Sequence, residues 1–184
     1  MIQCSCKMKK KIYIILSQTG TMFSRALKFF TKAEYNHASI SLSPTLDEMY
    51  SFGRLNPYNP FKGGFVKEGK NTGTFKRFYN TKAMVIELYI TEEEYYKIKF
   101  FIEYLQKNRL QFHYNYWGIF MACFKKNLEP KKRFYCSQFV RACLAYFDID
   151  NSRNLPKIIK PIDFMKLENK KIIYTGLLKN YFCS

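Results

Sequence analysis

Strand-like and helical segments follow one another in this chain without the regular strand–helix–strand alternation that builds a parallel sheet. Apolar runs and period-two patterns predict strands at 12–16, 37–43, 47–53, 65–68, 74–79, 83–90 and 171–174. Apolar residues at helical spacing predict helices at about 22–33, 91–107, 115–125, 136–147 and 162–167. A length of 184 residues, 47% of them hydrophobic, supports one well-filled core rather than two. We therefore expect an α+β fold with a single domain over 12–184, preceded by a basic tail at 1–11.

Local signals mark several of these boundaries. Thr91-Glu92-Glu93-Glu94 matches the capping box that opens a helix. Ser43-Pro44-Thr45 predicts the turn of a hairpin between the strands at 37–43 and 47–53. The segment 54–64, rich in Pro and Gly, is interpreted as an extended loop that helps to shape a pocket, together with Tyr50, Phe52 and Tyr58.

The strong positive charge is interpreted first as the Lys-rich composition that A/T-rich coding produces, with a mild attraction for anions. Lys and Arg number 31 against 14 Asp and Glu, which gives a net charge of +17. Such a charge attracts nucleic acid, anionic membrane or anionic substrates. Lys dominates and no Arg-rich run occurs, so a peptide, lipid or small-molecule substrate is favoured over nucleic acid or a membrane surface. The amphipathic helix at 22–33 is interpreted as core-facing, with a membrane-surface role as its alternative.

The cysteine pattern argues against a metal site or a disulfide framework. The six cysteines include no C-x-x-C pair, and Cys4 and Cys6 form an isolated couple. The apolar run at 12–16 is too short for a secretion signal, and no stretch approaches the ~18 apolar residues of a membrane span. We expect reduced thiols, a cytoplasmic location and chemistry without a cofactor or metal.

Cys136 is the candidate nucleophile. It opens the helix predicted at 136–147, and the thiol therefore meets the positive end of a helix dipole, which favours the reactive thiolate. Polar Ser137 and Gln138 follow it before the apolar face of the helix begins at Phe139. Cys143, two turns further along, is expected to pack in the core and is the natural control.

His37 is the candidate base among the two histidines of the chain. Period two places it on one strand face with Ser39 and Ser41, a polar face able to line a cleft, while Ala38 and Ile40 face the core. The competitor is His113, whose aromatic neighbours suggest a ring packed at a helix entrance or lining a substrate pocket.

A carboxylate is expected to orient the imidazole. Glu48 begins the adjoining strand, and hairpin pairing is expected to bring it toward His37. A register error of one residue would substitute Asp47 for Glu48. Tyr50 shares the strand face of Glu48 and is a further candidate for lining the cleft.

The segments Tyr35–Ile40, Glu48–Arg54 and Phe134–Val140 resemble the circularly permuted NlpC/P60 papain-like superfamily, especially its YiiX-like branch and the lecithin retinol acyltransferase relatives. The resemblance implies a five- or six-stranded antiparallel sheet packed against the helix of the nucleophile. It implies Cys136 as nucleophile, His37 as base and Glu48 as third member, with the backbone N–H of Cys136, assisted by Tyr135, stabilising the oxyanion. It also implies action on an amide, ester or thioester bond.

The sequence thus predicts a cysteine-dependent hydrolase or acyltransferase that works through an acyl-enzyme. The competing prediction is a non-catalytic module of the same fold that binds nucleic acid or anionic membrane through its basic surface. The first hypothesis requires His37 and Cys136 to meet in space.

Overall fold

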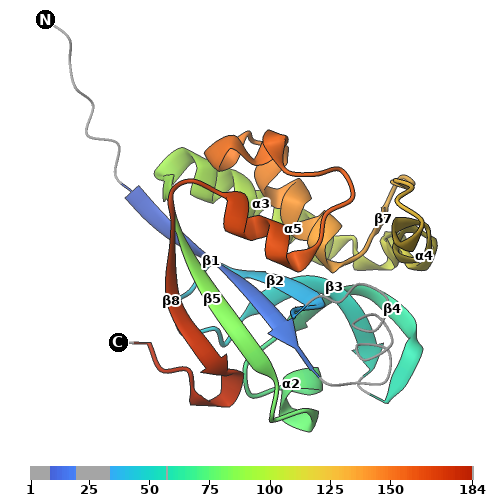
Figure 1. Ribbon diagram of the computed structural model, residues 1–184, viewed down its shortest axis with the longest axis horizontal. Coiled ribbons are helices and arrows are strands. Elements are labelled where there is room, and N and C mark those ends of the chain that lie inside the picture. The colour runs from blue at the N-terminus through green and yellow to red at the C-terminus, as the bar shows by residue number, and fades with distance from the viewer. Residues whose placement is uncertain (1–8, 20–33, 57, 184) are drawn as a thin grey trace, which may run out of the picture.

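One mixed sheet organises the computed structural model, which describes residues 9–19, 34–56 and 58–183 (Figure 1). Within these residues eight strands pair in the order β7-β6-β4-β3-β2-β1-β5-β8. All neighbours are antiparallel except β6 and β7, which are parallel. The strands are β1 (Lys9–Gln18), β2 (His37–Ser41), β3 (Met49–Asn56), β4 (Asn59–Glu68), β5 (Lys82–Thr91), β6 (His113–Tyr114), β7 (Arg133–Phe134) and β8 (Lys170–Leu177). The predicted α+β class is confirmed, with more strands than the family resemblance implied.

The helices connect and cover these strands. The α-helices are α2 (Gly73–Arg77), α3 (Glu92–Lys107), α4 (Tyr116–Cys123) and α5 (Cys136–Ala145). Short 3₁₀ helices occur at η1 (Arg109–Gln111), η2 (Ile149–Asn154), η3 (Pro161–Lys166) and η4 (Leu178–Asn180). No helix in the described part of the chain combines the length and apolarity needed to cross a membrane.

Strand β1 lies inside the sheet and is buried on both faces. Ile12, Ile14 and Leu16 belong to the core on one face, and Tyr13 and Ile15 belong to a second core on the other. A strand covered on both sides needs an uninterrupted apolar run rather than an alternating one, which is the pattern of 12–16.

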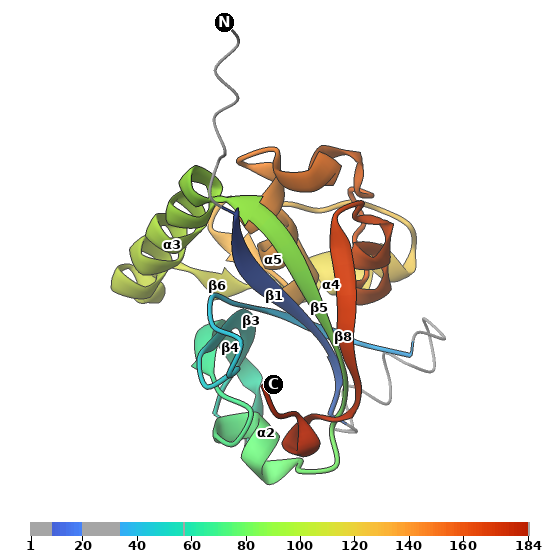
Figure 2. The same ribbon diagram turned by 90° about the vertical axis from the view of Figure 1, so that its left-hand side faces the viewer.

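Helices α3 and α5 cover one face of the sheet, as Figures 1 and 2 show from two sides. Phe139, Val140 and Leu144 of α5 pack with Ala38 and Ile40 of β2 in the larger core. Phe139 is completely buried, and burial of a side chain of this size contributes roughly 1.5–3 kcal/mol. This packing fixes the start of α5 against the start of β2.

The opposite face carries a smaller core that the sequence did not indicate. Phe75 of α2 and Leu178 of η4 pack there against Met49 and Ile15. In Figure 1 α2 and the C-terminal segment lie together, below the sheet. The sheet is consequently sandwiched, and the strand faces that look polar in the sequence are enclosed.

Several predicted boundaries are confirmed. The Thr91 hydroxyl accepts a hydrogen bond from the Glu94 N–H at 3.2 Å, and the Glu94 carboxylate accepts one from the Thr91 N–H at 2.7 Å, which completes the capping box of α3. The hairpin of β2 and β3 forms with Ile40 opposite Tyr50. The segment 162–167 is helical as the 3₁₀ helix η3.

Two predicted segments are wrong. Residues 54–64 are not a loop, because β3 extends to Asn56 and β4 starts at Asn59. Gly63 shows why a glycine-rich segment is a strand here. A Cβ at this position would lie 2.7 Å from the Tyr116 hydroxyl oxygen, so the glycine allows the Tyr116 side chain to approach the strand closely. The predicted strand at 74–79 is largely the helix α2, which buries Phe75.

The remaining predicted elements fall partly or wholly outside the described residues. The helix predicted at 22–33 lies there, as do residues 1–8 of the predicted basic tail. Lys9, Lys10 and Lys11, the last three residues of that predicted tail, instead form the first part of β1.

Candidate active site

Cys136 is the first residue of α5. Tyr135, the preceding N-cap residue, is extended, with φ −96° and ψ 169° typical of a cap, and its N–H donates to the Gln138 side-chain oxygen at 3.2 Å. Helix geometry leaves the N–H groups of Cys136 and Ser137 without intrahelical acceptors. The thiol therefore lies where a negative charge is stabilised by the helix end.

His37 is the first residue of β2, and it meets Cys136 across 99 positions of sequence. Ser17 of β1 pairs with His37, and the Ser17 carbonyl accepts the N–H of Asn36 at 3.1 Å, which fixes the entry of the strand. The Cys136 Sγ lies 3.9 Å from the Asn36 carbonyl oxygen. The imidazole of His37 and the thiol of Cys136 lie close enough for each to shift the pKa of the other.

Glu68, the last residue of β4, is the carboxylate beside His37. Its Oε2 lies 3.3 Å from the His37 Nε2 and accepts the Ser39 hydroxyl at 3.5 Å. The side chains of His37 and Glu68 are only 17% and 8% exposed. Since Nε2 faces Glu68, Nδ1 is the ring nitrogen available to the thiol of Cys136.

The prediction that Glu48 lies beside His37 is wrong. Glu48 is exposed and accepts hydrogen bonds from the Tyr50 hydroxyl at 2.9 Å and from Lys67 Nζ at 2.7 Å. Because β2 and β3 are antiparallel with Ile40 opposite Tyr50, Glu48 lies toward the end of β2 that is remote from His37. The alternative, Asp47, is exposed in the turn before β3.

The sequence held only part of the signal for Glu68. The predicted strand at 65–68 ends on it, and period two groups it with Val66. Its proximity to His37, however, depends on β3 and β4 pairing over their full length, with Met49 opposite Glu68. The interpretation of 54–64 as a loop concealed that pairing.

Electrostatics favour a charged pair of thiolate and imidazolium. Burial alone lowers the pKa of His37, but hydrogen bonds to Cys136 and Glu68, with the charge of Glu68, outweigh it and raise the pKa to about 10. Burial alone raises the pKa of Cys136, but the hydrogen bond to His37 and its positive charge reverse the balance and lower it. Cys143, buried without such a partner, has a raised pKa.

Of the predicted pocket residues, Ser39 and Tyr135 lie in or beside the site. Ser39 is completely buried against Glu68, so the polar face of β2 is enclosed and does not line an open cleft. Tyr135 is 5% exposed, and burial raises the pKa of its hydroxyl while a hydrogen bond from the backbone of Ile159 opposes that rise. The N–H of Cys136 and the Tyr135 hydroxyl both remain candidate donors to an oxyanion.

The structure does not bring the other predicted pocket residues to the thiol. Tyr50 is bonded to Glu48 at the remote end of β2, and Phe52 is completely buried among core aromatics. His113 is exposed. Tyr58 is 77% exposed, with the Arg77 guanidinium 4.0 Å above its ring.

Tyr114 is a site residue that the sequence reasoning missed. It is buried and close enough to Cys136 for the thiolate to raise its pKa, after burial itself, which is the largest cause. A phenol with so high a pKa stays protonated and can donate a hydrogen bond. The aromatic residues around His113 predict a packed or pocket-lining ring in this segment. Because side chains alternate along β6, Tyr114 is the buried residue and His113 is exposed.

A buried amide pair supports the start of α5. The Gln138 side-chain oxygen accepts from the Asn115 amide at 3.0 Å, and both amides donate to the Leu128 carbonyl, at 3.2 and 2.9 Å. The Asn115 oxygen in turn accepts the N–H of Gly118 and caps α4. These bonds hold the entrances of α4 and α5 together.

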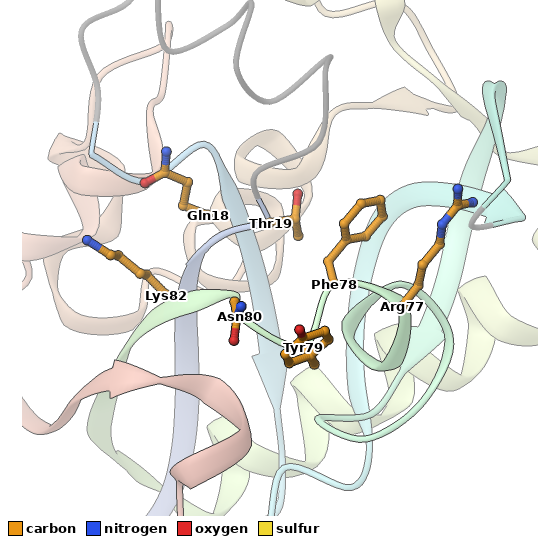
Figure 3. A pocket seen from close by; sticks show the side chains of 7 residues that line it. All are labelled: Gln18, Thr19, Arg77, Phe78, Tyr79, Asn80 and Lys82. Atoms are coloured by element: carbon orange, nitrogen blue, oxygen red, sulfur yellow. The ribbon is translucent and has the colours of Figure 1, made fainter.

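A basic pocket of about 400 Å³ lies at the same end of the sheet as His37 (Figure 3). It is lined by Gln18, Thr19, Arg77, Phe78, Tyr79, Asn80 and Lys82. Gln18 follows the residue paired with His37, and the ring of Phe75 in α2 lies 6.3 Å from that of His37. Arg77 and Lys82 lie on opposite sides of the pocket in Figure 3, and no carboxylate is among the lining residues.

Among the described residues, no group of three or more His, Cys, Asp or Glu side chains is arranged to hold a metal ion. Comparisons with protein-family models, with curated proteins and with solved structures find no match to this chain. A function is therefore argued from the geometry of Cys136, His37 and Glu68.

Proposed function

We propose that the protein is a cysteine-dependent hydrolase or acyltransferase in which Cys136 is the nucleophile, His37 the base and Glu68 the orienting carboxylate. The observation that carries the proposal is the largely buried imidazole of His37, which lies 3.3 Å from Glu68 and close enough to the Cys136 thiol to lower its pKa. A histidine held between a nucleophile and a carboxylate is the arrangement of a catalytic triad.

The reaction follows from the charges of these groups. The Cys136 thiolate attacks the carbonyl carbon of the substrate, and the negative charge that develops on the carbonyl oxygen is stabilised by the N–H of Cys136. Protonated His37 gives its proton to the leaving amine, alcohol or thiol, and a thioester of Cys136 remains. His37 then takes a proton from water or an acceptor amine, which attacks the thioester and releases the acyl group.

The same arrangement supports the permuted papain-like fold as our structural proposal. The nucleophile helix α5 packs on a sheet whose strand β2 carries the histidine, and His37 precedes Cys136 in the chain. The carboxylate comes from β4, two strands along from β2, rather than from the start of β3 as the resemblance implied. The proposal therefore assigns the third position to Glu68.

The substrate is proposed to carry a negative charge. Arg77 and Lys82 lie in the pocket at the His37 end of the sheet, and the chain has a net charge of +17. A pocket lined by cations, amides and aromatic rings without a carboxylate suits an anionic group attached to the acyl chain or the leaving group.

Trapping the acyl-enzyme tests the proposal. The purified protein is mixed with a panel of activated esters and thioesters, quenched with acid and digested, and the peptide containing Cys136 is weighed. We expect an acyl adduct on Cys136 in the wild type and in Cys143→Ala, and none in Cys136→Ala. An adduct distributed equally over Cys136 and Cys143, or hydrolysis that persists in Cys136→Ala, would reject the enzyme function.

A further inference from the structure

Helix α4 carries a row of exposed aromatic side chains. Trp117, Phe120 and Phe124 are 68%, 53% and 62% exposed. Their rings touch edge to face in sequence, with centroids 5.9 Å apart for the first pair and 5.2 Å for the second. The spacing of three and four residues places all three on one side of the helix.

This side of α4 is not needed to hold the helix in the fold. The helix is attached through its other side, where the Asn115 cap and Gly118 are buried against the start of α5. Figure 1 shows α4 at the margin of the molecule, beside β7. Three large aromatic side chains therefore remain in solvent at an edge of the molecule, which is a mark of an interaction surface.

Exposed basic residues follow the aromatic row along the chain. Between Tyr116 and Tyr135 the chain contains five cations and a single acid, Glu129, which lies 3.8 Å from Arg141. The five cations, all exposed, are Lys125, Lys126, Lys131, Lys132 and Arg133. We call Trp117, Phe120 and Phe124 with these five residues the α4 face.

A second aromatic row on α3 shows why the charge matters. Tyr96, Phe100 and Tyr104 are 53%, 72% and 46% exposed at a spacing of four residues. That helix, however, contains four acids, Glu92, Glu93, Glu94 and Glu103, against three lysines. Exposed rings occur on both helices, but only the α4 face combines them with a strong excess of positive charge.

We propose that the α4 face binds the surface of an anionic lipid bilayer. Aromatic rings, and tryptophan above all, favour the boundary between headgroups and acyl chains, and nearby lysines are attracted by anionic headgroups. The aromatic row supplies the first interaction and the cations that follow it supply the second. Neither alone gives stable attachment, whereas the two together do.

The α4 face is linked to the proposed catalytic site through the other side of α4. Asn115, which caps α4, is hydrogen-bonded to Gln138, two residues beyond Cys136. The membrane proposal itself does not depend on catalysis, because it is measured as binding.

Trp117 is the only tryptophan of the chain, so its fluorescence reports on the α4 face directly. The purified full-length protein is titrated with vesicles of phosphatidylcholine alone and with vesicles containing about 30% phosphatidylglycerol. We expect a blue shift and co-sedimentation with the anionic vesicles only. Absence of a shift, or an equal response to both vesicles, would overturn the proposal.

Matched variants separate the α4 face from general attraction by a basic protein. Phe120→Ala/Phe124→Ala keeps Trp117 as the reporter and should weaken vesicle binding about tenfold or more. Tyr96→Ala/Phe100→Ala, which removes equally exposed rings from α3, should bind as the wild type does. Equal binding by both double variants would overturn the proposal.

Two further measurements complete the test. If the aromatic variant is unfolded by circular dichroism, Lys125→Glu/Lys126→Glu replaces it, with the same expected loss of binding. Sedimentation velocity without vesicles tests the alternative that the α4 face binds a second copy of the chain. A wild-type dimer that the aromatic variant converts to monomer would show a subunit interface and overturn the membrane proposal.

Discussion

At the scale of single residues, His37 lies between the carboxylate of Glu68 and the thiol of Cys136. Glu68 keeps a proton on the imidazole, and the resulting positive charge keeps the proton off Cys136. Each shift depends on the other, because a thiolate is stable in this buried position only beside imidazolium. The reactivity proposed for Cys136 is therefore a property of three side chains.

The carboxylate of Glu68 should control the reactivity of Cys136, whereas that of Glu48 should not. Glu68→Gln preserves the shape of the side chain but removes its charge, which lowers the pKa of His37 and raises that of Cys136. We expect alkylation of Cys136 at neutral pH to slow about tenfold or more. Site-resolved mass spectrometry after timed exposure to iodoacetamide measures the rate.

Glu48→Gln is the matched control, because it removes a carboxylate that contacts Lys67 and Tyr50 instead of His37. Its alkylation rate should equal that of the wild type. If Glu48→Gln slows the reaction and Glu68→Gln does not, the assignment of the third residue is incorrect.

Cys136 and His37 could be singled out from local sequence, while Glu68 and Tyr114 could not. A thiol at a helix start and a histidine at a strand start each have a pattern within a few residues. Glu68 reaches His37 only through the pairing of β3 with β4, and Tyr114 reaches Cys136 through the two-residue strand β6. Both depend on the tertiary arrangement of distant segments.

At the scale of elements, the start of α5 is fixed by side-chain amides rather than by a Ser or Thr cap. Gln138 accepts from Tyr135 and Asn115 and donates to Leu128, and it is 6% exposed. Loss of Gln138 therefore leaves several buried polar groups without partners, and each such group costs about 1–3 kcal/mol.

Gln138→Ala should destabilise the protein and also slow the alkylation of Cys136, because the first turn of α5 loses its support. Thr91→Ala is the comparison, since it breaks the capping box of α3 and should cost about 1 kcal/mol. Urea unfolding gives the two stability losses. We expect Thr91→Ala to leave the alkylation rate of Cys136 unchanged. A normal alkylation rate in Gln138→Ala would show that Gln138 does not support the position of Cys136.

Elements with strong local signals could be predicted, and elements shaped by their neighbours could not. The capping residues of α3 and the apolar run of β1 are decisive within a few positions. In contrast, β4 contains glycines because Tyr114 and Tyr116 approach it closely, and α2 is helical because Phe75 enters the second core. From composition alone, the segment 54–64 is predicted as a loop and the segment 74–79 as a strand.

At the scale of the whole molecule, the sheet is enclosed by two cores, and the charged pair lies at one end of it. The net charge of +17 indicates anionic partners but does not locate them. Only the fold distinguishes the pocket beside His37 from the α4 face, and the α4 face from the aromatic row of α3.

The charged pair should give the stability of the whole molecule a distinctive pH dependence. The raised pKa of His37 contributes stability below pH 6.5 that is lost as the pH rises toward about 10. The lowered pKa of Cys136 contributes stability above pH 9.0 that is lost as the pH falls. Where the folded thiol is ionised and the imidazole is still protonated, the folded pair holds one proton, as the unfolded residues do between pH 6.5 and 9.0, so the two effects cancel there.

We therefore expect the difference in unfolding free energy between the wild type and His37→Ala/Cys136→Ala to be flat toward pH 9.0, where the folded thiol is ionised, and to fall as the pH rises from 9.0 toward about 10. Guanidinium unfolding across this range measures it. A difference that declines steadily up to pH 9.0 would mean that the thiol of Cys136 stays protonated and that only His37 titrates.

The most direct measurement compares the two buried thiols of α5 in one protein. Native protein at pH 7 is exposed to iodoacetamide, and the labelling of Cys136 and Cys143 is followed separately by peptide mass. The account predicts that Cys136 reacts at least about a hundred times faster than Cys143, and that His37→Ala removes most of that difference. Slow and equal labelling of both cysteines would contradict the account.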